Sequence, residues 1–382
     1  MCSKIMSMKK IIILGAGMVG SAMAIDLSKD HRVTVSDIAA GALEKLKKRC
    51  EDLQILRLDV TDRGAMQQAI SDFDLVINAV PGHLGFETLK SIIEAGKDVI
   101  DIAFFPENAL DLDGLALKCG VTAIVDCGVA PGMDNLILGY YNEIMKLTDF
   151  ECLVGGLPKL KKWPFFYKAP FSPVDVIEEY IRPARYVENG EVIVREALSD
   201  CEYVEFDGVG TLEAFNTDGL RSIIYTMPHI PNMKEKTLRY PGHVEYIKVL
   251  KESGFFSEEP MEVDGKMIIP LEFTRGVLFK EWELGENEEE ITVFRVRLKG
   301  ENSEGITEEV IYNMHEEFDR ETGTSSMART TGYTATAAAN VFLEGVFNEK
   351  GVFPPELLGR HRACFDYIMD YLEERNIRYI RH

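Results

Sequence analysis

Three glycines near the start of the chain have the spacing of a dinucleotide-binding loop. The G-x-G-x-x-G motif directly follows the apolar run 11–14 and opens a helical stretch. Glycines at these positions allow a tight turn, close approach of a pyrophosphate to the backbone, and close packing of helix on strand. The residues expected to contact the dinucleotide here are Gly15, Gly17, Met18, Val19 and Gly20.

An acidic residue lies where such a loop needs one to select its cofactor. Asp37 ends the second apolar run, about 20 residues beyond the glycines. Its carboxylate can accept hydrogen bonds from both hydroxyls of the adenosine ribose, and it would repel the 2′-phosphate of NADP. No arginine follows it directly, so we expect NAD as the cofactor.

Two further strand ends are expected at the same edge of the sheet, because ligands of open α/β sheets bind at the carboxyl ends of the strands. We expect the adenine near Asp59 and the ribose of the nicotinamide near Ala79. Asp59 has a local alternative, which is to cap a helix beginning near Thr61. The residues at these two strand ends are Asp59, Val60, Ala79, Val80 and Pro81.

The elements that position these residues form a regular pattern. From residue 9 to about 129, short β-branched runs alternate with helical stretches, and helices are predicted over 18–29, 40–49 and 84–95 and after Thr61. Six apolar runs separated by helices indicate a parallel, doubly wound Rossmann sheet, hence an α/β fold. This Rossmann domain is assigned to residues 8–130.

The pattern changes after Gly132. The segments 150–158, 201–208, 290–300 and 308–318 are strand-like, and apolar residues 294, 296 and 298 alternate with basic residues 295, 297 and 299. Such alternation indicates a sheet with one solvated face. We therefore predict an α+β domain over residues 131–350 for substrate binding and oligomerisation. A helical segment, 351–382, should pack back on the Rossmann domain.

Four shorter predictions concern this second half. A helix begins after Ser172 and runs to about Tyr180, because Ser172 and Pro173 suit the first positions of a helix. A helix rich in small residues is expected over 326–347, and one continuous amphipathic helix over 355–374. The acidic stretch 286–290 is interpreted as a solvated turn.

Composition narrows the class of partner. Acidic residues outnumber basic ones by 63 to 42, giving a net charge of −21. That charge repels phosphate backbones, so neither nucleic acid nor a membrane surface is an expected partner. The seven cysteines show no metal-ligand spacing, and no metal is expected. No apolar run reaches the roughly 18 residues needed to span a bilayer, so we expect a cytoplasmic protein.

Several unusual strings in the second half resemble one family. They are GVAPGMDN (128–135), VGGLP (154–158), FYK (166–168), EEYIRPARYVENG (178–190), EAFNTDGLRS (213–222), LRYPGH (238–243) and SSMARTTGYTA (325–335). With the glycine motif they resemble the saccharopine dehydrogenase superfamily, and most closely its L-lysine 6-dehydrogenase branch. The resemblance implies a homodimer or tetramer, a substrate cleft between domains, and NAD-dependent oxidation of a small amino acid.

Three positions favour lysine within that superfamily. Saccharopine reductases carry a tyrosine, an aspartate and a cysteine around the substrate, and these positions are here Phe104, Ala130 and Val154. A site for a tricarboxylate should keep polar groups to pair with it. The expected reaction is therefore oxidation of L-lysine at its 6-amino group to the semialdehyde, which cyclises to piperideine-6-carboxylate. The alternatives are a saccharopine or carboxynorspermidine dehydrogenase, and a nucleotide sensor without turnover.

Candidate substrate contacts follow from the same motifs. A carboxylate favours the two parallel donors of a guanidinium, so Arg221 and Arg239 are expected to hold the α-carboxylate. Their alternative is to pair as surface residues with local acids. Asp218 either orients Arg221 or receives the α-amino group, and Phe104 lies on the substrate wall.

The proton acceptor has several candidates. Asp101 ends the fifth strand beside the expected nicotinamide, where burial could raise its pKa. His243 has a suitable intrinsic pKa, and Tyr167 could donate to the substrate. Each has a structural alternative: Asp101 as a backbone acceptor, His243 as a packed core group, and Tyr167 as part of the interdomain wall. Glu107 and His83 are weaker candidates.

Overall fold

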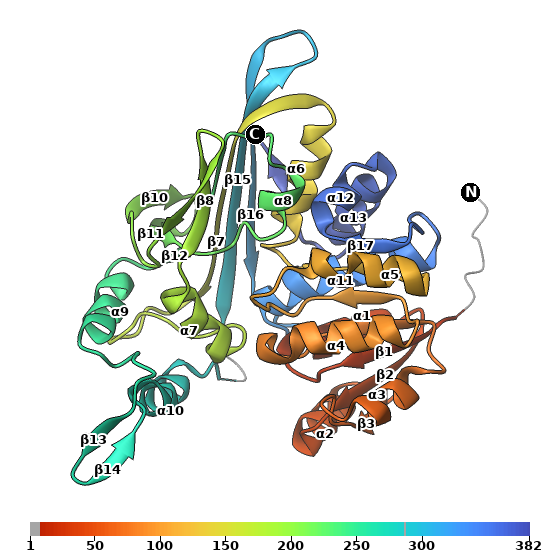
Figure 1. The fold of residues 1–382 in the computed structure, drawn as a ribbon, viewed down its shortest axis with the longest axis horizontal. Coiled ribbons are helices and arrows are strands. Elements are labelled where there is room, and N and C mark those ends of the chain that lie inside the picture. Colours follow the sequence, from red (N-terminus) through yellow and green to blue (C-terminus); the bar gives the residue numbers. More distant parts are fainter. Residues whose placement is uncertain (1–7, 286–287) are drawn as a thin grey trace.

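Six strands from the first third of the chain and one from near its C-terminus form a wholly parallel sheet (Figure 1). The computed structural model describes residues 8–285 and 288–382, and its strand order is β17, β6, β5, β4, β1, β2, β3. The strands are β1 (Lys10–Leu14), β2 (Arg32–Asp37), β3 (Gln54–Arg57), β4 (Leu75–Asn78), β5 (Val99–Asp101), β6 (Thr122–Ile124) and β17 (Gly351–Phe353). Because β1 lies between β2 and β4, the sheet is doubly wound, as predicted.

Helices cover both faces of this sheet. Ile11 and Ile13 of β1 pack into one apolar cluster, and Ile12 and Leu14 pack into another. A strand buried on both faces needs apolar residues at every position, which explains its unbroken run of β-branched residues. The helices are α1 (Met18–Leu27), α2 (Ala40–Arg49), α3 (Arg63–Ile70), α4 (Gly82–Glu94) and α5 (Asp113–Cys119), with a 3-10 turn, η1 (Ala109–Leu112).

A mixed sheet forms the other part of the molecule, at the left of Figure 1. Its strand order is β10, β11, β12, β7, β15, β16, β18, with β8 pairing with β12 and β9. Phe294, Val296 and Leu298 are buried while Lys299 is exposed, so the predicted alternation is confirmed. The strands are β7 (Met145–Pro158), β8 (Ala184–Glu188), β9 (Glu191–Arg195), β10 (Glu202–Phe206), β11 (Gly210–Asn216), β12 (Asn232–Arg239), β15 (Glu290–Asn302), β16 (Thr307–Glu317) and β18 (Ile380–Arg381).

Helices and one hairpin surround the mixed sheet. The hairpin of β13 (Met261–Val263) and β14 (Lys266–Ile268) projects from the body of the molecule in Figure 1. The helices are α6 (Met133–Asn142), α7 (Pro173–Ile181), α8 (Ile223–Thr226), α9 (His243–Glu252), α10 (Pro270–Trp282), α11 (Ser326–Leu343), α12 (Pro355–Gly359) and α13 (Arg362–Glu374). No helix among residues 8–285 and 288–382 is long and apolar enough to cross a membrane.

Two local predictions are wrong. The expected continuous helix over 355–374 is two helices, α12 and α13, and Gly359 at the end of α12 packs directly on the backbone of α6, where a Cβ would lie 2.2 Å from the carbonyl oxygen of Leu136. The expected solvated turn fails at Glu290, which is 1% exposed and accepts hydrogen bonds from the backbone N–H and hydroxyl of Ser326 at the start of α11. Residues 286 and 287 lie outside the described part of the chain.

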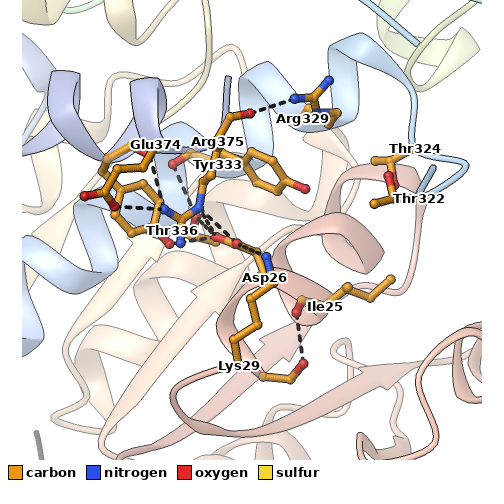
Figure 2. A network of polar contacts seen from close by, with 12 residues as sticks. Ile25, Asp26, Lys29, Thr322, Thr324, Arg329, Tyr333, Thr336, Glu374 and Arg375 are labelled. Atoms are coloured by element: carbon orange, nitrogen blue, oxygen red, sulfur yellow. Dashed lines mark hydrogen bonds and ion pairs between the residues drawn. The ribbon is translucent and has the colours of Figure 1, made fainter. Parts of the chain in front are cut away.

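Polar contacts tie the C-terminal helices to the Rossmann domain (Figure 2). Asp26 on α1 is buried and accepts hydrogen bonds from Thr336 of α11, from the Tyr371 hydroxyl and from Arg375 beyond α13. The hydrogen bonds and the positive charge of Arg375 outweigh burial and lower the pKa of Asp26. The segment after residue 350 thus joins both parts, because β17 extends the parallel sheet and β18 the mixed one.

Candidate active site between the two sheets

A cavity of about 540 Å³ opens where the carboxyl ends of the Rossmann strands face the mixed sheet. Its Rossmann side comes from the loops that follow β1, β2, β4, β5 and β6, and its far side from β7, β12 and α7. The lining therefore combines the edge where α/β sheets bind ligands with one face of the second sheet.

The glycine loop has the shape that a dinucleotide requires. Gly15 has a φ of +120°, and a Cβ there would lie 2.4 Å from the carbonyl oxygen of Ala79. A Cβ on Gly20 would lie 2.1 Å from the carbonyl oxygen of Gly15, whereas one on Gly17 would meet no protein atom within 4 Å. Two glycines thus permit close packing within the protein, and Gly17 leaves room on the cavity side for a pyrophosphate.

Most of the predicted cofactor residues gather on this cavity. Those on its lining are Gly15, Gly17, Met18, Val19, Gly20, Asp37, Ala79, Val80 and Pro81. The carboxylate of Asp37 accepts backbone hydrogen bonds from Ala16 and Ala39, each at 2.8 Å, so it is held at the end of β2. These residues fit a nicotinamide dinucleotide.

Asp59 and Val60 are not on the lining of the cavity. Asp59 accepts hydrogen bonds from the backbone N–H of Thr61 at 2.9 Å and from its hydroxyl at 2.7 Å, and these bonds lower the pKa of the carboxyl. The local alternative therefore describes Asp59 better, although the residue that caps α3 is Asp62, which accepts from the N–H of Ala65.

Asp101 lies behind the cavity wall rather than on it. Its carboxyl is fully buried and accepts hydrogen bonds from the Asn78 amide and from the backbone N–H of Ala103. Burial, opposed by these hydrogen bonds, raises the pKa of Asp101 to about 8. The contact with Ala103 fixes the turn that brings residues 102–104 to the cavity, which favours a supporting role.

Arg221 is likewise turned away from the substrate space. Its Nε donates to Asp126 at 2.9 Å, Nη1 donates to the carbonyl oxygen of Phe105 at 2.6 Å, and the guanidinium carbon lies 4.7 Å from the ring centroid of Phe104. Asp126 and Phe104 line the cavity, whereas Arg221 does not. Arg221 therefore holds two wall residues in place.

Arg239 lines the cavity, and Tyr167 and His243 lie behind it. The guanidinium of Arg239 donates to Glu179 at 2.9 Å and to the hydroxyl of Tyr180 at 3.2 Å, and its carbon lies 4.4 Å from the ring centroid of Tyr167. Burial raises the pKa of Tyr167 well above its ordinary value, so the tyrosine stays neutral.

Both nitrogens of His243 are engaged. Nδ1 donates to the carbonyl oxygen of Phe165 at 2.8 Å, so Nε2 is the acceptor of the 2.9 Å hydrogen bond from the Tyr180 hydroxyl. Burial, followed by the positive charge of Arg239, lowers the pKa of His243 to about 3. This neutral ring orients the tyrosine that supports Arg239, and it is not on the lining of the cavity.

Asp218 lines the cavity but is paired with Arg185 rather than with Arg221. Arg185 donates from Nε at 2.8 Å and from Nη2 at 2.9 Å to its two carboxylate oxygens. The three predicted wall positions, Phe104, Ala130 and Val154, all line the cavity and give it an apolar side.

The structure adds a charged side that the sequence motifs did not indicate. Helix α7 and the residue that follows it present four charged residues to the cavity, at spacings of three, four and seven residues from the first: Asp175, Glu178 and Glu179 on the helix, and Arg182 directly after it. Residues at these spacings share one face of a helix. Strand β12 presents Glu235, Thr237 and Arg239, whose spacing of two places them on one face of the strand. Both patterns are visible in the sequence once the elements are known.

A dinucleotide loop that shares one cavity with a second, mixed-sheet domain defines a two-domain protein of the NAD(P)-binding class. A family model described as the saccharopine dehydrogenase NADP binding domain matches residues 11–124. A second, described as the saccharopine dehydrogenase C-terminal domain, matches residues 128–377. The chain therefore belongs to the saccharopine dehydrogenase family.

Two curated relatives and one solved structure show how far the likeness extends. Saccharopine dehydrogenase [NADP(+), L-glutamate-forming] of Schizosaccharomyces pombe is 27% identical over 269 residues, which is 67% of this chain and only 60% of that relative. Carboxyaminopropylagmatine dehydrogenase of Synechocystis sp. is 23% identical over 374 residues, covering 91% and 92% of the two chains. The solved apo saccharopine dehydrogenase (L-Glu forming) of Saccharomyces cerevisiae has a TM-score of 0.78, with 22% identity over 98% and 99% of the chains. The last likeness concerns the fold.

Proposed function

We propose that the protein oxidises the 6-amino group of L-lysine with NAD, and that water hydrolyses the resulting iminium, giving the 6-semialdehyde, ammonia and NADH. The observation that carries the proposal is the single cavity, which joins the dinucleotide loop to an apolar wall and to a charged wall. An amino acid with a methylene chain and charged ends matches that combination. Family membership supports the dehydrogenase chemistry.

The charges of the cavity favour a substrate with amino groups over a tricarboxylate. Besides Asp37, six carboxyl groups line it, against the two guanidinium groups of Arg182 and Arg239. Saccharopine would bring three carboxylates into this acidic space, and each would need desolvated cationic partners. Lysine brings two amino groups and one carboxylate. The six acids are Asp126, Asp175, Glu178, Glu179, Asp218 and Glu235.

The chain's own residues can orient the substrate and take its proton. When bound, the nicotinamide accepts the hydride from the carbon that carries the amine. The apolar wall of Phe104, Ala130 and Val154 excludes water from the methylene chain. Apart from Asp37 at the cofactor end, the cavity carboxyls of the described residues that lie outside any ion pair are Asp175 and Glu235. Burial raises the pKa of both carboxyls, so each takes up a proton more readily than an exposed carboxyl does.

The cofactor preference belongs to the same proposal. Asp37, fixed by two backbone hydrogen bonds at the end of β2, supports NAD, because a second negative charge there repels a 2′-phosphate. We also propose that the protein acts in the cytoplasm as a homo-oligomer. The exposed apolar residues Met261 and Met267 of the projecting hairpin support an oligomeric contact.

A second candidate is a dehydrogenase of a carboxylated polyamine. The relative from Synechocystis sp. matches nearly end to end and is named for a carboxyl-bearing aminopropyl derivative of agmatine. The acid-rich cavity would suit such a cation equally well. The carboxynorspermidine dehydrogenase considered as an alternative in the sequence analysis belongs to the same class of enzyme.

Assays with matched substrates would separate these candidates. NADH formation should be followed with L-lysine, ornithine, saccharopine and carboxylated polyamines at equal concentration, with NADP in place of NAD as the second arm. Lysine should give the highest kcat/KM. Ornithine, one methylene shorter, should lose about 1–3 kcal/mol in kcat/KM. A higher kcat/KM for saccharopine or for the polyamine would transfer the proposal to that substrate.

A further inference from the structure

Two charged side chains on the cavity have buried polar atoms without partners, and they carry opposite charges. Among the described residues, Oε2 of Glu235 and Nη1 of Arg182 accept or donate no hydrogen bond. Buried polar atoms in folded proteins are nearly always paired, and an unpaired one needs an explanation. Both residues line the same cavity, so a bound ligand can supply what each of them lacks.

The carboxyl of Glu235 is fixed in place, and no cationic side chain of the described residues forms an ion pair with it. The residue is 4% exposed, and a Cβ on Gly219 would lie 1.9 Å from the carboxyl carbon, so the carboxyl packs flat against that glycine. The neighbouring lysines of β12 point elsewhere, because Lys234 pairs with Glu151 and Lys236 with Glu202. Burial, and then repulsion from Asp134 and Glu179, raises the pKa of Glu235 well above its usual range. A bound cation would offset this burial and the repulsion from the neighbouring carboxyls.

Arg182 has donor capacity that Arg239 lacks. The N–H groups of Arg239 are engaged by Tyr180, by the carbonyl oxygen of Leu238, and by Glu179 with Tyr167. Arg182 makes only a long contact of 3.9 Å from Nη2 to Glu178, and its guanidinium carbon lies 5.3 Å from the ring centroid of Phe104. It can therefore receive a carboxylate without losing a strong internal partner.

We propose that Glu235 and Arg182 are the two recognition poles of the cavity, Glu235 for an ammonium group and Arg182 for a carboxylate of one zwitterionic ligand. This inference rests on the proposed oxidation of an amino acid and adds the residues that select it. Glu235 and Arg182 then determine substrate specificity, whereas Arg239 holds the side chains of the cavity wall in position.

The test is an equilibrium binding experiment with the reduced cofactor, which cannot accept a hydride from the probes. Isothermal titration calorimetry of the full chain in the presence of NADH would use 6-aminohexanoate, hexanoate and pentylamine. Glu235→Gln should weaken pentylamine and 6-aminohexanoate by about tenfold or more and leave hexanoate unchanged, because it removes one charge-assisted contact. Arg182→Gln should weaken hexanoate and 6-aminohexanoate and leave pentylamine unchanged.

Matched controls guard against a general loss of structure. Glu213→Gln changes a buried acid on the neighbouring β11, and Arg275→Gln removes the other partner of Glu178; neither residue lines the cavity. Both controls should bind all three probes like the parent protein. Gly219→Ala, which displaces the Glu235 carboxyl without changing charge, should weaken pentylamine and 6-aminohexanoate and leave hexanoate unchanged.

Equal weakening of all probes by either variant, or unchanged binding of the matching probe, would overturn the proposal. A parent protein that binds none of the probes would do so too. The result also separates the two proposals. If each variant weakens only its matching probes but lysine is not oxidised, the roles of Glu235 and Arg182 are supported and the proposed function is refuted. If lysine is oxidised but the variants do not show this selectivity, the proposed function is supported and the roles of Glu235 and Arg182 are refuted.

Discussion

Replacing Arg221 should destabilise the protein far more than it weakens binding of the amino acid. Arg221 and Asp126 are each 5% exposed in their side chains and form an ion pair of 2.9 Å. Removing one partner of a buried pair leaves the other charge uncompensated, which costs about 3–5 kcal/mol. Arg221→Gln also removes the hydrogen bond to the carbonyl oxygen of Phe105, so we expect the upper part of that range.

The assay compares unfolding in guanidinium with steady-state kinetics for the parent protein, Arg221→Gln, Asp126→Asn and the double variant. Each single variant should lose stability, and the double variant should recover much of the loss, because a neutral buried pair is tolerated far better than a lone charge. Arg185→Gln is the control, since its pair with Asp218 is 30% exposed on the arginine side. If Arg221→Gln unfolds at the parent midpoint while KM for the amino acid rises, then Arg221 contacts the substrate and the positioning role is refuted.

Three other perturbations test separate parts of the account. Because the pKa of Asp101 in the folded protein, about 8, lies above its ordinary value of 3.8, the folded state keeps a proton that the unfolded state releases, and stability falls as pH rises from 4 to 8. Asp101→Asn should flatten that fall by at most about 1.4 kcal/mol per pH unit, as measured from unfolding midpoints at pH 5 and 8; an unchanged slope would mean that Asp101 is ionised when folded. Asp37→Ser should raise the affinity for NADP relative to NAD. Arg57 occupies the position opposite Asp37 on β3, so adding Arg57→Ala to that variant should cancel much of the gain. Tighter binding of NADP than of NAD by the parent protein would contradict the role of Asp37. Gly17→Ala should weaken dinucleotide binding with little change in stability, since a Cβ there meets no protein atom within 4 Å. Gly20→Ala should instead destabilise the fold, because its Cβ would lie 2.1 Å from a carbonyl oxygen. Equal losses of stability in the two variants would argue against open space for the dinucleotide at Gly17.

Local patterns predicted the elements and the cofactor end of the site. The apolar runs, the glycine motif and Asp37 are short-range signals, because each depends on neighbours along the chain. The broken helix at Gly359 shows the limit of such signals. Gly359, the last residue of α12, lies against the backbone of α6, and no residue near Gly359 in the sequence indicates that contact.

The substrate end depends on pairs that are distant in sequence. Arg221 and Asp126 are 95 residues apart, and His243 and Tyr180 are 63 apart. The residue types alone therefore suggested catalytic or binding roles, but the partners that engage these side chains could not be predicted from the sequence. The charged face of α7 was accessible in principle, since the helix itself was predicted and the spacing from Asp175 to Arg182 is seven residues. The role of Glu235 was the hardest to predict. Its carboxyl oxygen has no hydrogen-bond partner, and this can be recognised only when all neighbouring side chains have been placed.

The most direct test of the central claim follows the hydride itself. L-lysine carrying two deuterium atoms at C6 should be incubated with the protein and NAD, and the NADH analysed by mass spectrometry. We expect one deuterium in each NADH and none from lysine labelled at C2. Deuterium transferred from C2, or no NADH formed from lysine at all, would contradict oxidation at the 6-amino group.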